Sequence, residues 1–180
     1  METILRRARL KNGTLVDIGI DQGNIVAIEP VLAIDAHREL QADGHLTLPA
    51  FVNGQLHACK SFWRRLQSRL LPEQAHLPRF EAASLVKQQY TAEDVIERVD
   101  ETMRLAIRHG TCAIRLFADV DEASGLAAIE GLLAIRRRYA RWMTVQVVAF
   151  PQDGLGSNQS MSLMRSAMEL GADVVGGIPW

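Results

Sequence analysis

Short apolar runs separated by turn-forming residues characterise the first 48 positions of the chain. Three runs cover residues 4–10, 14–20 and 25–28, and the clusters between them each place Asn next to Gly. Asn and Gly adopt positive φ readily, which tight hairpins require. The pattern predicts a small antiparallel meander, which cannot bury both of its faces by itself.

After this segment the pattern changes to helices that alternate with short apolar runs. An apolar stripe at helical spacing, formed by Val95, Val99, Met103 and Ile107, follows a capping signal at Thr91. Residues 61–90 remain unassigned because Pro72 and Pro78 interrupt any long helix. The predicted strands are 50–57, 111–117, 144–150 and 173–178, and the predicted helices are 91–110, 122–141 and 160–170.

Alternating strands and helices are typical of right-handed βαβ units and a parallel sheet. Apolar runs such as 145–150 suit strands covered on both faces. About four strands are predicted, half of the roughly eight that close a barrel. The expected fold class is α/β: a partial (β/α) TIM-type barrel preceded by a small antiparallel β-sandwich segment. The expected domains are residues 1–48, β-rich, and residues 49–180, the first half of a parallel β/α barrel.

Composition narrows the classes of function. Hydrophobic residues make up 48% of the chain, so a folded core is expected. A formal net charge of -1 provides no overall field for nucleic acid or an anionic membrane. The basic run Arg136–Arg138 lies at a predicted helix end, where a solvated face is favoured over a phosphate site. Two unpaired cysteines, with no leader and no apolar span, predict a soluble cytoplasmic protein without nucleic-acid or membrane partners.

Function in parallel β/α folds gathers beyond the carboxyl ends of the strands, and a family resemblance is visible there. The chain resembles the amidohydrolase superfamily, and most of all its cytosine deaminase and isopropylammelide-hydrolase branch. The segments that carry the resemblance span nearly the whole chain, and the last two are the most specific. They are residues 48–53, 60–62, 110–115, 147–152 and 171–179.

The resemblance implies metal-assisted hydrolysis of a ring carbon–nitrogen bond. In that family a divalent ion, zinc or iron, is held by histidines and an aspartate and makes hydroxide near neutral pH. The hydroxide attacks a ring carbon that bears an amino or alkylamino group. The first strand of the family ends in His-x-His, whose alternate side chains point the same way. The implied partner is therefore a small heteroaromatic amine.

This chain departs from the family pattern at the site positions. Gln55 replaces the first histidine, while His57 remains as the single candidate metal ligand. An amide oxygen is a poor replacement for imidazole as a ligand of zinc or iron. We therefore expect no cofactor in this chain and assign no catalytic residue. The other replacements are Cys59 for aspartate, Leu116-Phe117 for Thr-His and Trp180 for histidine.

Gln152 matches the family glutamine that binds the edge of the substrate ring, because its amide both donates and accepts. Each candidate has a plainer interpretation. Gln152 would then cap a strand end as a loop residue, and His57 would be a hydrogen-bonded histidine at a strand end. A nucleophile pair of Cys59 with His57 is weakly supported, since adjacency in sequence does not bring side chains together.

The remaining residues with chemical potential have structural interpretations. Asp119 and Asp121 are expected to bond to loop amides or to cap the next helix. Phe117 and Trp180 are expected to fill the space of a metal site. Surface or packing roles are expected for His37, His45, His76 and His109.

Three hypotheses follow for the function. The first is a truncated or degenerate amidohydrolase that is inactive alone. The second is a non-catalytic module for ligand binding or oligomerisation. The third is a half barrel completed by a second chain. An open half barrel exposes strand edges and an apolar face, so a homo-oligomer or a complementing chain is expected.

Overall fold

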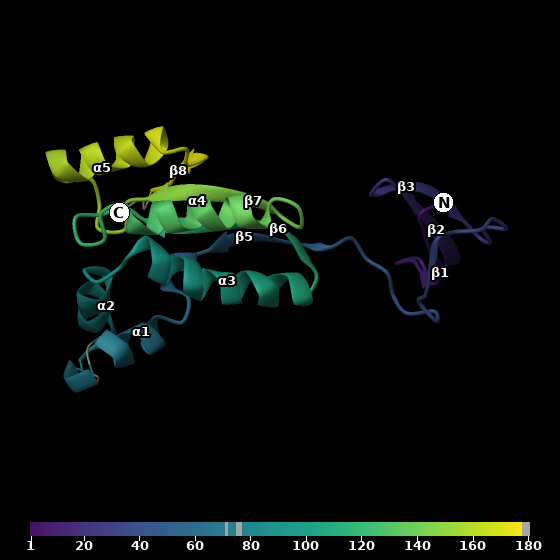
Figure 1. The fold of residues 1–180 in the computed structure, drawn as a ribbon, viewed down its shortest axis with the longest axis horizontal. Helices are drawn as coiled ribbons and strands as arrows, with labels where there is room; N and C mark the ends of the chain where they lie inside the picture. Colours follow the sequence, from purple (N-terminus) through teal and green to yellow (C-terminus); the bar gives the residue numbers. More distant parts are fainter. Residues whose placement is uncertain (71, 75–76, 178–180) are drawn as a thin grey trace. The chain divides into compact units, whose positions relative to one another are not determined.

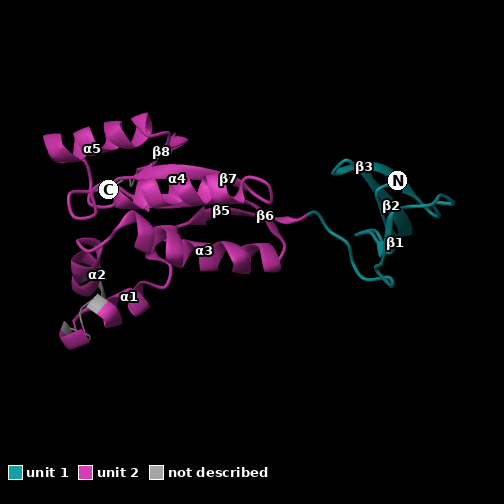
Figure 2. Cartoon of the chain, viewed as in Figure 1, with its two compact units in different colours: residues 1–49 teal, residues 50–180 magenta. Residues whose placement is uncertain are grey.

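The computed structural model of the chain describes residues 1–70, 72–74 and 77–177 (Figure 1). The chain divides into two compact units, Met1–Pro49 and Ala50–Trp180 (Figure 2). Each unit contains its own four-stranded sheet, and the sheet of the second unit is entirely parallel. Among the described residues no helix is both long and apolar enough to cross a bilayer.

The first unit is one sheet with the strand order β3-β2-β1-β4. The hairpins that join β1 to β2 and β2 to β3 are antiparallel, as the turn signals predicted, and Gly13 and Gly23 adopt φ of 88° and 75° in them. The expected meander is incomplete, because β4 lies parallel to β1. The four residues of β4 are all exposed, so the strand has no alternation of apolar residues from which it could be predicted. The strands are β1 (Thr3–Arg9), β2 (Leu15–Asp21), β3 (Asn24–Glu29) and β4 (Arg38–Gln41).

A buried carboxylate organises the small first unit. Asp17 accepts hydrogen bonds from the Arg6 guanidinium at 2.8 Å and from the backbone amides of Arg7 at 3.0 Å and Leu32 at 3.1 Å. These bonds tie β1 and the segment after β3 to β2. The buried apolar residues of the unit are few: Ile4, Ala8, Val16 and Ile18.

The second unit places four parallel strands in sequence order, β5-β6-β7-β8. β6 runs two residues beyond its predicted end, to Asp119, while β8 is shorter than predicted. The elements are β5 (Phe51–Leu56), η1, a 3-10 helix (Ala58–Lys60), α1 (Trp63–Leu70), η2, also a 3-10 helix (Pro72–Gln74), α2 (Arg79–Lys87), α3 (Ala92–Arg108), β6 (Thr111–Asp119), α4 (Ala127–Tyr139), β7 (Thr144–Phe150), α5 (Asn158–Glu169) and β8 (Val174–Val175).

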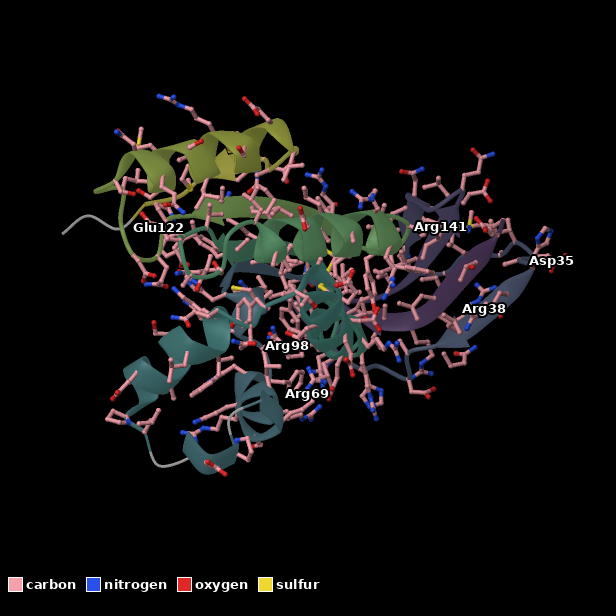
Figure 3. The ribbon with its side chains drawn as sticks, turned by 60° about the vertical axis from the view of Figure 1, so that its left-hand side comes forward. Asp35, Arg38, Arg69, Arg98, Glu122 and Arg141 are labelled. Atoms are coloured by element: carbon pink, nitrogen blue, oxygen red, sulfur yellow. The ribbon has the colours of Figure 1, made fainter. Side chains whose placement is uncertain are left out.

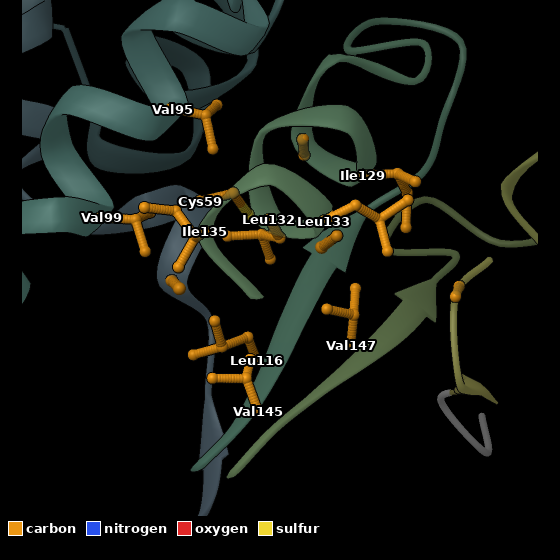
Figure 4. Packing of buried hydrophobic residues seen from close by; sticks show 14 of the residues in the cluster. Cys59, Val95, Val99, Leu116, Ile129, Leu132, Leu133, Ile135, Val145 and Val147 are labelled. Atoms are coloured by element: carbon orange, nitrogen blue, oxygen red, sulfur yellow. The ribbon is translucent and has the colours of Figure 1, made fainter. Parts of the chain in front are cut away.

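Helices α3 and α4 cover one face of this sheet and form the main core with it (Figure 4). The Thr91 hydroxyl accepts from the Asp94 amide at 3.2 Å, which confirms the predicted start of α3. Helix α4 begins at Ala127, later than predicted, because residues 121–125 form a turn closed by the Gly125 amide on the Asp121 carbonyl. The core contains Val95, Val99, Met103, Ile114, Leu116, Ala118, Ile129, Leu132, Leu133, Ile135, Val145 and Val147, among others.

The segment that the sequence left unassigned forms two short helices, α1 and α2. Its start is held to α3 by the Arg98 guanidinium, which donates to the carbonyls of Cys59 at 2.6 Å and Ser61 at 2.7 Å. Arg98 and Arg69, both labelled in Figure 3, donate to the carboxylate of Asp94. Tertiary contacts with α3 therefore place this segment beside the carboxyl edge of the sheet.

Candidate functional site

Side chains from three consecutive strand ends meet at the carboxyl edge of the parallel sheet. His57 follows β5, Asp119 ends β6 and Gln152 follows β7. Lys60, on η1, joins them: its Nζ donates to Gln152 Oε1 at 2.5 Å and lies 3.1 Å from Asp119 Oδ2. Parallel strands bring their carboxyl ends to one edge, which is why residues so far apart in sequence become neighbours.

Asp119 is buried without a hydrogen bond. Its side chain is 0% exposed, and its Oδ1 lies 3.8 Å from His57 Nδ1, which is beyond hydrogen-bonding distance. The Lys60 ammonium forms an ion pair with Oδ2, but without the alignment of a hydrogen bond. The expectation that Asp119 bonds to loop amides is therefore wrong. The interpretation of His57 as a hydrogen-bonded histidine is also not supported, since its Nδ1 has no partner among the described residues.

The imidazole of His57 packs in an aromatic cluster. Its ring centroid lies 5.1 Å from that of Phe117 and 5.0 Å from that of Phe150, and the two phenyl rings are 5.5 Å apart. The family resemblance leads one to expect a histidine at position 117; Phe117 instead contributes a phenyl ring to this cluster. Trp180 and His76 lie outside the described residues.

Asp121 is saturated, although it lies only two residues from Asp119. Its Oδ1 accepts from the backbone amides of Ala123 at 3.1 Å and Ser124 at 2.9 Å, as expected for a loop carboxylate. Its Oδ2 accepts from Lys87 at 2.5 Å, and Lys87 also donates to Asp153 at 2.8 Å. This triad joins α2 to the ends of β6 and β7.

The environment keeps the Lys87–Asp121 pair charged. Burial alone would lower the pKa of Lys87, but hydrogen bonds to the two carboxylates outweigh it and raise that pKa. Burial alone would likewise raise the pKa of Asp121, and the hydrogen bonds from Lys87 and Ser124 lower it below its ordinary value. Sequence reasoning missed Lys87 because it lies in a segment with no assigned element and no local spacing signal.

A cavity of about 490 Å³ opens beside this edge, within the size range of small-molecule sites. Gln152 and Lys60 line it, together with Lys87 and Asp153, and the rings of Trp63 and Tyr90 add aromatic surface. The Arg98 guanidinium stacks over the Tyr90 ring, 5.0 Å from its centroid. The cavity thus combines a few polar groups with aromatic walls. The interpretation of Gln152 as a mere cap of a strand end is too narrow.

Cys59 is an inert thiol in this structure. Its side chain is fully buried, and the thiol donates to the Phe117 carbonyl at 3.6 Å. Burial, and then the negative charge of Asp119, raise the pKa of Cys59 to about 12. A thiol that stays protonated at neutral pH argues against a nucleophile pair with His57.

The described residues do not fit a divalent metal ion. No three His, Cys, Asp or Glu side chains in this part of the chain gather to hold one. His57 and Asp119 offer two donor groups, while the Lys60 ammonium beside Asp119 repels a cation. Gln55, in the place of the first histidine, is exposed. The protonated thiol of Cys59 adds no ligand.

Individual known proteins match nearly all of the chain, although no protein-family model matches it. It is 30% identical to the N-isopropylammelide isopropyl amidohydrolase of Pseudomonas sp. (strain ADP), over 98% of this chain and 45% of that protein. The 5-methylcytosine deaminase of Klebsiella pneumoniae, liganded with phosphonocytosine, superposes with a TM-score of 0.79 at 32% identity, over 98% of this chain and 43% of that one.

A third relative agrees with these two. The N-isopropylammelide isopropylaminohydrolase of Burkholderia multivorans gives a TM-score of 0.78 at 25% identity, over 98% of this chain and 45% of that one. The chain therefore spans less than half the length of the relatives that it matches.

Proposed function

Because the chain belongs to the amidohydrolase superfamily and matches the N-terminal half of its cytosine deaminases and isopropylammelide hydrolases, we propose that its cavity binds a nitrogen heteroaromatic ring with an amino substituent. The matched relatives are by name enzymes that act on 5-methylcytosine and on N-isopropylammelide. The observation that carries the proposal for this chain is the Lys60–Gln152 hydrogen bond at the cavity wall.

This hydrogen bond fixes which end of the Gln152 amide is available. An ammonium group can only donate, so Lys60 selects the amide oxygen. The two N–H bonds of Gln152 Nε2 then remain for a ligand. Lys60 donates one N–H to Gln152 and forms an ion pair with Asp119 without a hydrogen bond, so its other N–H groups remain for a ligand. The polar wall is therefore rich in donors and complements a ring edge with a carbonyl oxygen beside an unprotonated ring nitrogen.

Aromatic surface and the buried ion pair complete the proposed binding site. Trp63 and Tyr90 line the cavity and offer flat faces for a flat ring. Lys87 holds α2 against the strand ends through Asp121 and Asp153 and so keeps the cavity walls together. These residues bind and orient a ring and exclude water from its faces.

We further propose that this chain by itself binds the ring without hydrolysing it. The superfamily is generally metal-dependent, and the described residues do not fit the metal. His57 is the family ligand position that remains, Gln55 occupies the first histidine of the same motif, and Phe117 occupies another site position where the family has a histidine. The free cysteines Cys59 and Cys112 favour a reducing compartment, so we place this role in the cytoplasm.

Calorimetric titration of the full chain with 5-methylcytosine and with an aminotriazine tests the binding proposal. Aniline, which has the amino group but no ring acceptor, is the control ligand. Gln152→Leu is expected to weaken binding about tenfold or more, because the ring edge loses its donors. Gln146→Leu is the matched control: Gln146 lies on β7, the strand that precedes Gln152, accepts from Arg115 of β6 and does not line the cavity. Equal affinity of wild type and Gln152→Leu would contradict the proposal.

Catalysis is tested separately. The purified chain is assayed for bound metal and for ammonia release from the same rings with added Zn²⁺ or Fe²⁺. We expect neither stoichiometric metal nor turnover. Metal in a one-to-one ratio together with ammonia release would overturn the non-hydrolytic role of this chain.

A second candidate role is assembly, and the sheet edges favour it. The outer edges of β5 and β8 have no strand partner among the described residues. Phe51, Val52 and Val175 on these strands are 61%, 70% and 57% exposed. We propose that the parallel sheet is the first half of a β/α barrel that a second copy or a complementing chain continues. Size-exclusion chromatography with light scattering tests this, and a stable, well-behaved monomer would count against it.

A further inference from the structure

Among the buried aspartates that the structure describes, Asp119 is distinguished by its lack of hydrogen bonds. Asp17, Asp94, Asp100 and Asp121 each accept at least two. Neither oxygen of Asp119 accepts one, and its side chain is 0% exposed. Burying an unsatisfied charge is costly, so a fold keeps one where it serves something other than stability.

The position of Asp119 shows what it acts on. A fully buried carboxylate cannot reach a ligand directly. Its two neighbours are partly exposed, with side-chain values of 28% for His57 and 34% for Lys60. Oδ1 faces the imidazole and Oδ2 faces the ammonium. Asp119 therefore lies behind two groups that can themselves meet a ligand.

We propose that Asp119 is the positioning residue of this site: its negative charge, with Oδ1 3.8 Å from His57 Nδ1, favours the proton of the imidazole on Nδ1, and its ion pair through Oδ2 keeps Lys60 beside Gln152. In a neutral histidine, the group next to one ring nitrogen decides which nitrogen carries the proton. A carboxylate only accepts, so it selects the Nδ1–H tautomer. The buried Nδ1 leaves the exposed side of the ring to Nε2, which then presents a lone pair.

This inference deepens the proposed function. Only its consequence for ligand binding rests on that function. Lys60 and Gln152 line the cavity, and their donors suit the carbonyl and ring nitrogen of a ligand, whereas His57 is not among the lining residues. The tautomer itself exists without a ligand. Its measurement can therefore fail or succeed independently of ring binding.

Asp119→Asn tests the inference directly. The amide has nearly the same shape as the carboxylate, but one of its two ends is a hydrogen-bond donor instead of an acceptor. Lys60 can only donate, so it takes the amide oxygen of the new side chain. The NH₂ end then faces His57 Nδ1 and donates to it. Nδ1 becomes an acceptor, and the proton moves to Nε2, the wrong-tautomer effect known for a triad aspartate changed to asparagine.

The experiment is ¹⁵N NMR of the full chain labelled at histidine, recorded at mildly alkaline pH. Loss of a signal in His57→Gln assigns it. We expect Nδ1–H in the wild type and Nε2–H in Asp119→Asn. Asp121→Asn is the matched control: it removes a buried carboxylate two residues away that faces Lys87, and it should retain Nδ1–H.

Two outcomes would overturn the proposal. One is Nε2–H at His57 in the wild type, which decides the matter even if Asp119→Asn does not fold. The other is an unchanged tautomer in a folded Asp119→Asn. A purely structural role for Asp119 would change the stability of the protein without inverting the tautomer.

Discussion

The two units of the chain treat a buried carboxylate in opposite ways. In the first unit Asp17 accepts from one guanidinium and two backbone amides. At the sheet edge of the second unit Asp119 accepts no hydrogen bond, and its neighbours His57 and Lys60 are partly exposed. A satisfied buried charge stabilises local structure, whereas an unsatisfied one is tolerated where a ligand is bound.

The protonation behaviour of Asp17 follows from its hydrogen bonds. Burial by itself would raise the pKa of Asp17, but the amides of Arg7 and Leu32 and the guanidinium of Arg6 outweigh it. The pKa of Asp17 therefore lies below its ordinary value. In a unit with so few buried apolar side chains, this polar network provides much of the specificity of the fold.

The largest effect is expected from Lys87→Met, which breaks the saturated pair at the site edge. The side chains of Lys87 and Asp121 are 7% and 3% exposed, so the substitution leaves Asp121 as a buried charge without its cation. We expect a loss of about 3–5 kcal/mol in the free energy of unfolding of the second unit. Urea denaturation, monitored by hydrogen exchange in the peptides of the second unit, measures this loss of stability. The double variant Lys87→Met with Asp121→Leu should recover most of the loss, and a single variant as stable as wild type would contradict the role of the pair.

A smaller loss is expected from Asp17→Asn in the first unit. The substitution removes the charge that Arg6 and two backbone amides bind, so about 2–3 kcal/mol should be lost. Hydrogen exchange by mass spectrometry should show faster exchange in peptides from residues 1–49. Peptides from β6 and β7 serve as the internal control. Equal acceleration in both units would show that the units do not unfold separately.

Acid should also lower the stability of the first unit, but less than Asp17→Asn does. The reason is that a protonated Asp17 still accepts hydrogen bonds. A carboxylate whose pKa is lowered in the folded state stabilises that state above the unfolded pKa of about 3.9. This contribution is lost as the pH falls through the lower pKa of the folded state. The protection of residues 1–49 against exchange, corrected for the intrinsic exchange rate at each pH, should therefore fall below about pH 4. In Asp17→Asn the same pH step should have a smaller effect.

The smallest effect on stability is expected from Asp119→Asn. The substitution removes the ion pair with the partly exposed Lys60, but the carboxylate has no hydrogen bond to lose and a neutral side chain is less costly to bury, so the two effects largely offset each other. We expect a change of less than about 1 kcal/mol in the free energy of unfolding, of either sign. Urea denaturation beside Asp17→Asn makes the comparison direct. A loss as large as that of Asp17→Asn would place Asp119 among the structural carboxylates.

Much of the candidate site could be predicted from the sequence because strand ends are local features. The apolar runs that end near His57 and Phe150 placed His57 and Gln152 at the same edge, and the structure brings them there. β4 and α2 could not be predicted, since β4 has no buried residue and α2 follows two prolines. Lys87 went unnoticed for the same reason. Its partner carboxylates come from loops that lie 34 and 66 residues further along the chain.

The sequence by itself determined the alternation of strands and helices and carried the resemblance to the amidohydrolase superfamily, because periodicity and residue identity are local. Only the tertiary structure decided which of two neighbouring aspartates is satisfied. Asp119 and Asp121 are two residues apart, yet one faces His57 and Lys60 while the other meets Lys87 and loop amides. Hydrogen bonding depends on which donors the fold brings within about 3 Å, and that is set by packing across the sheet edge.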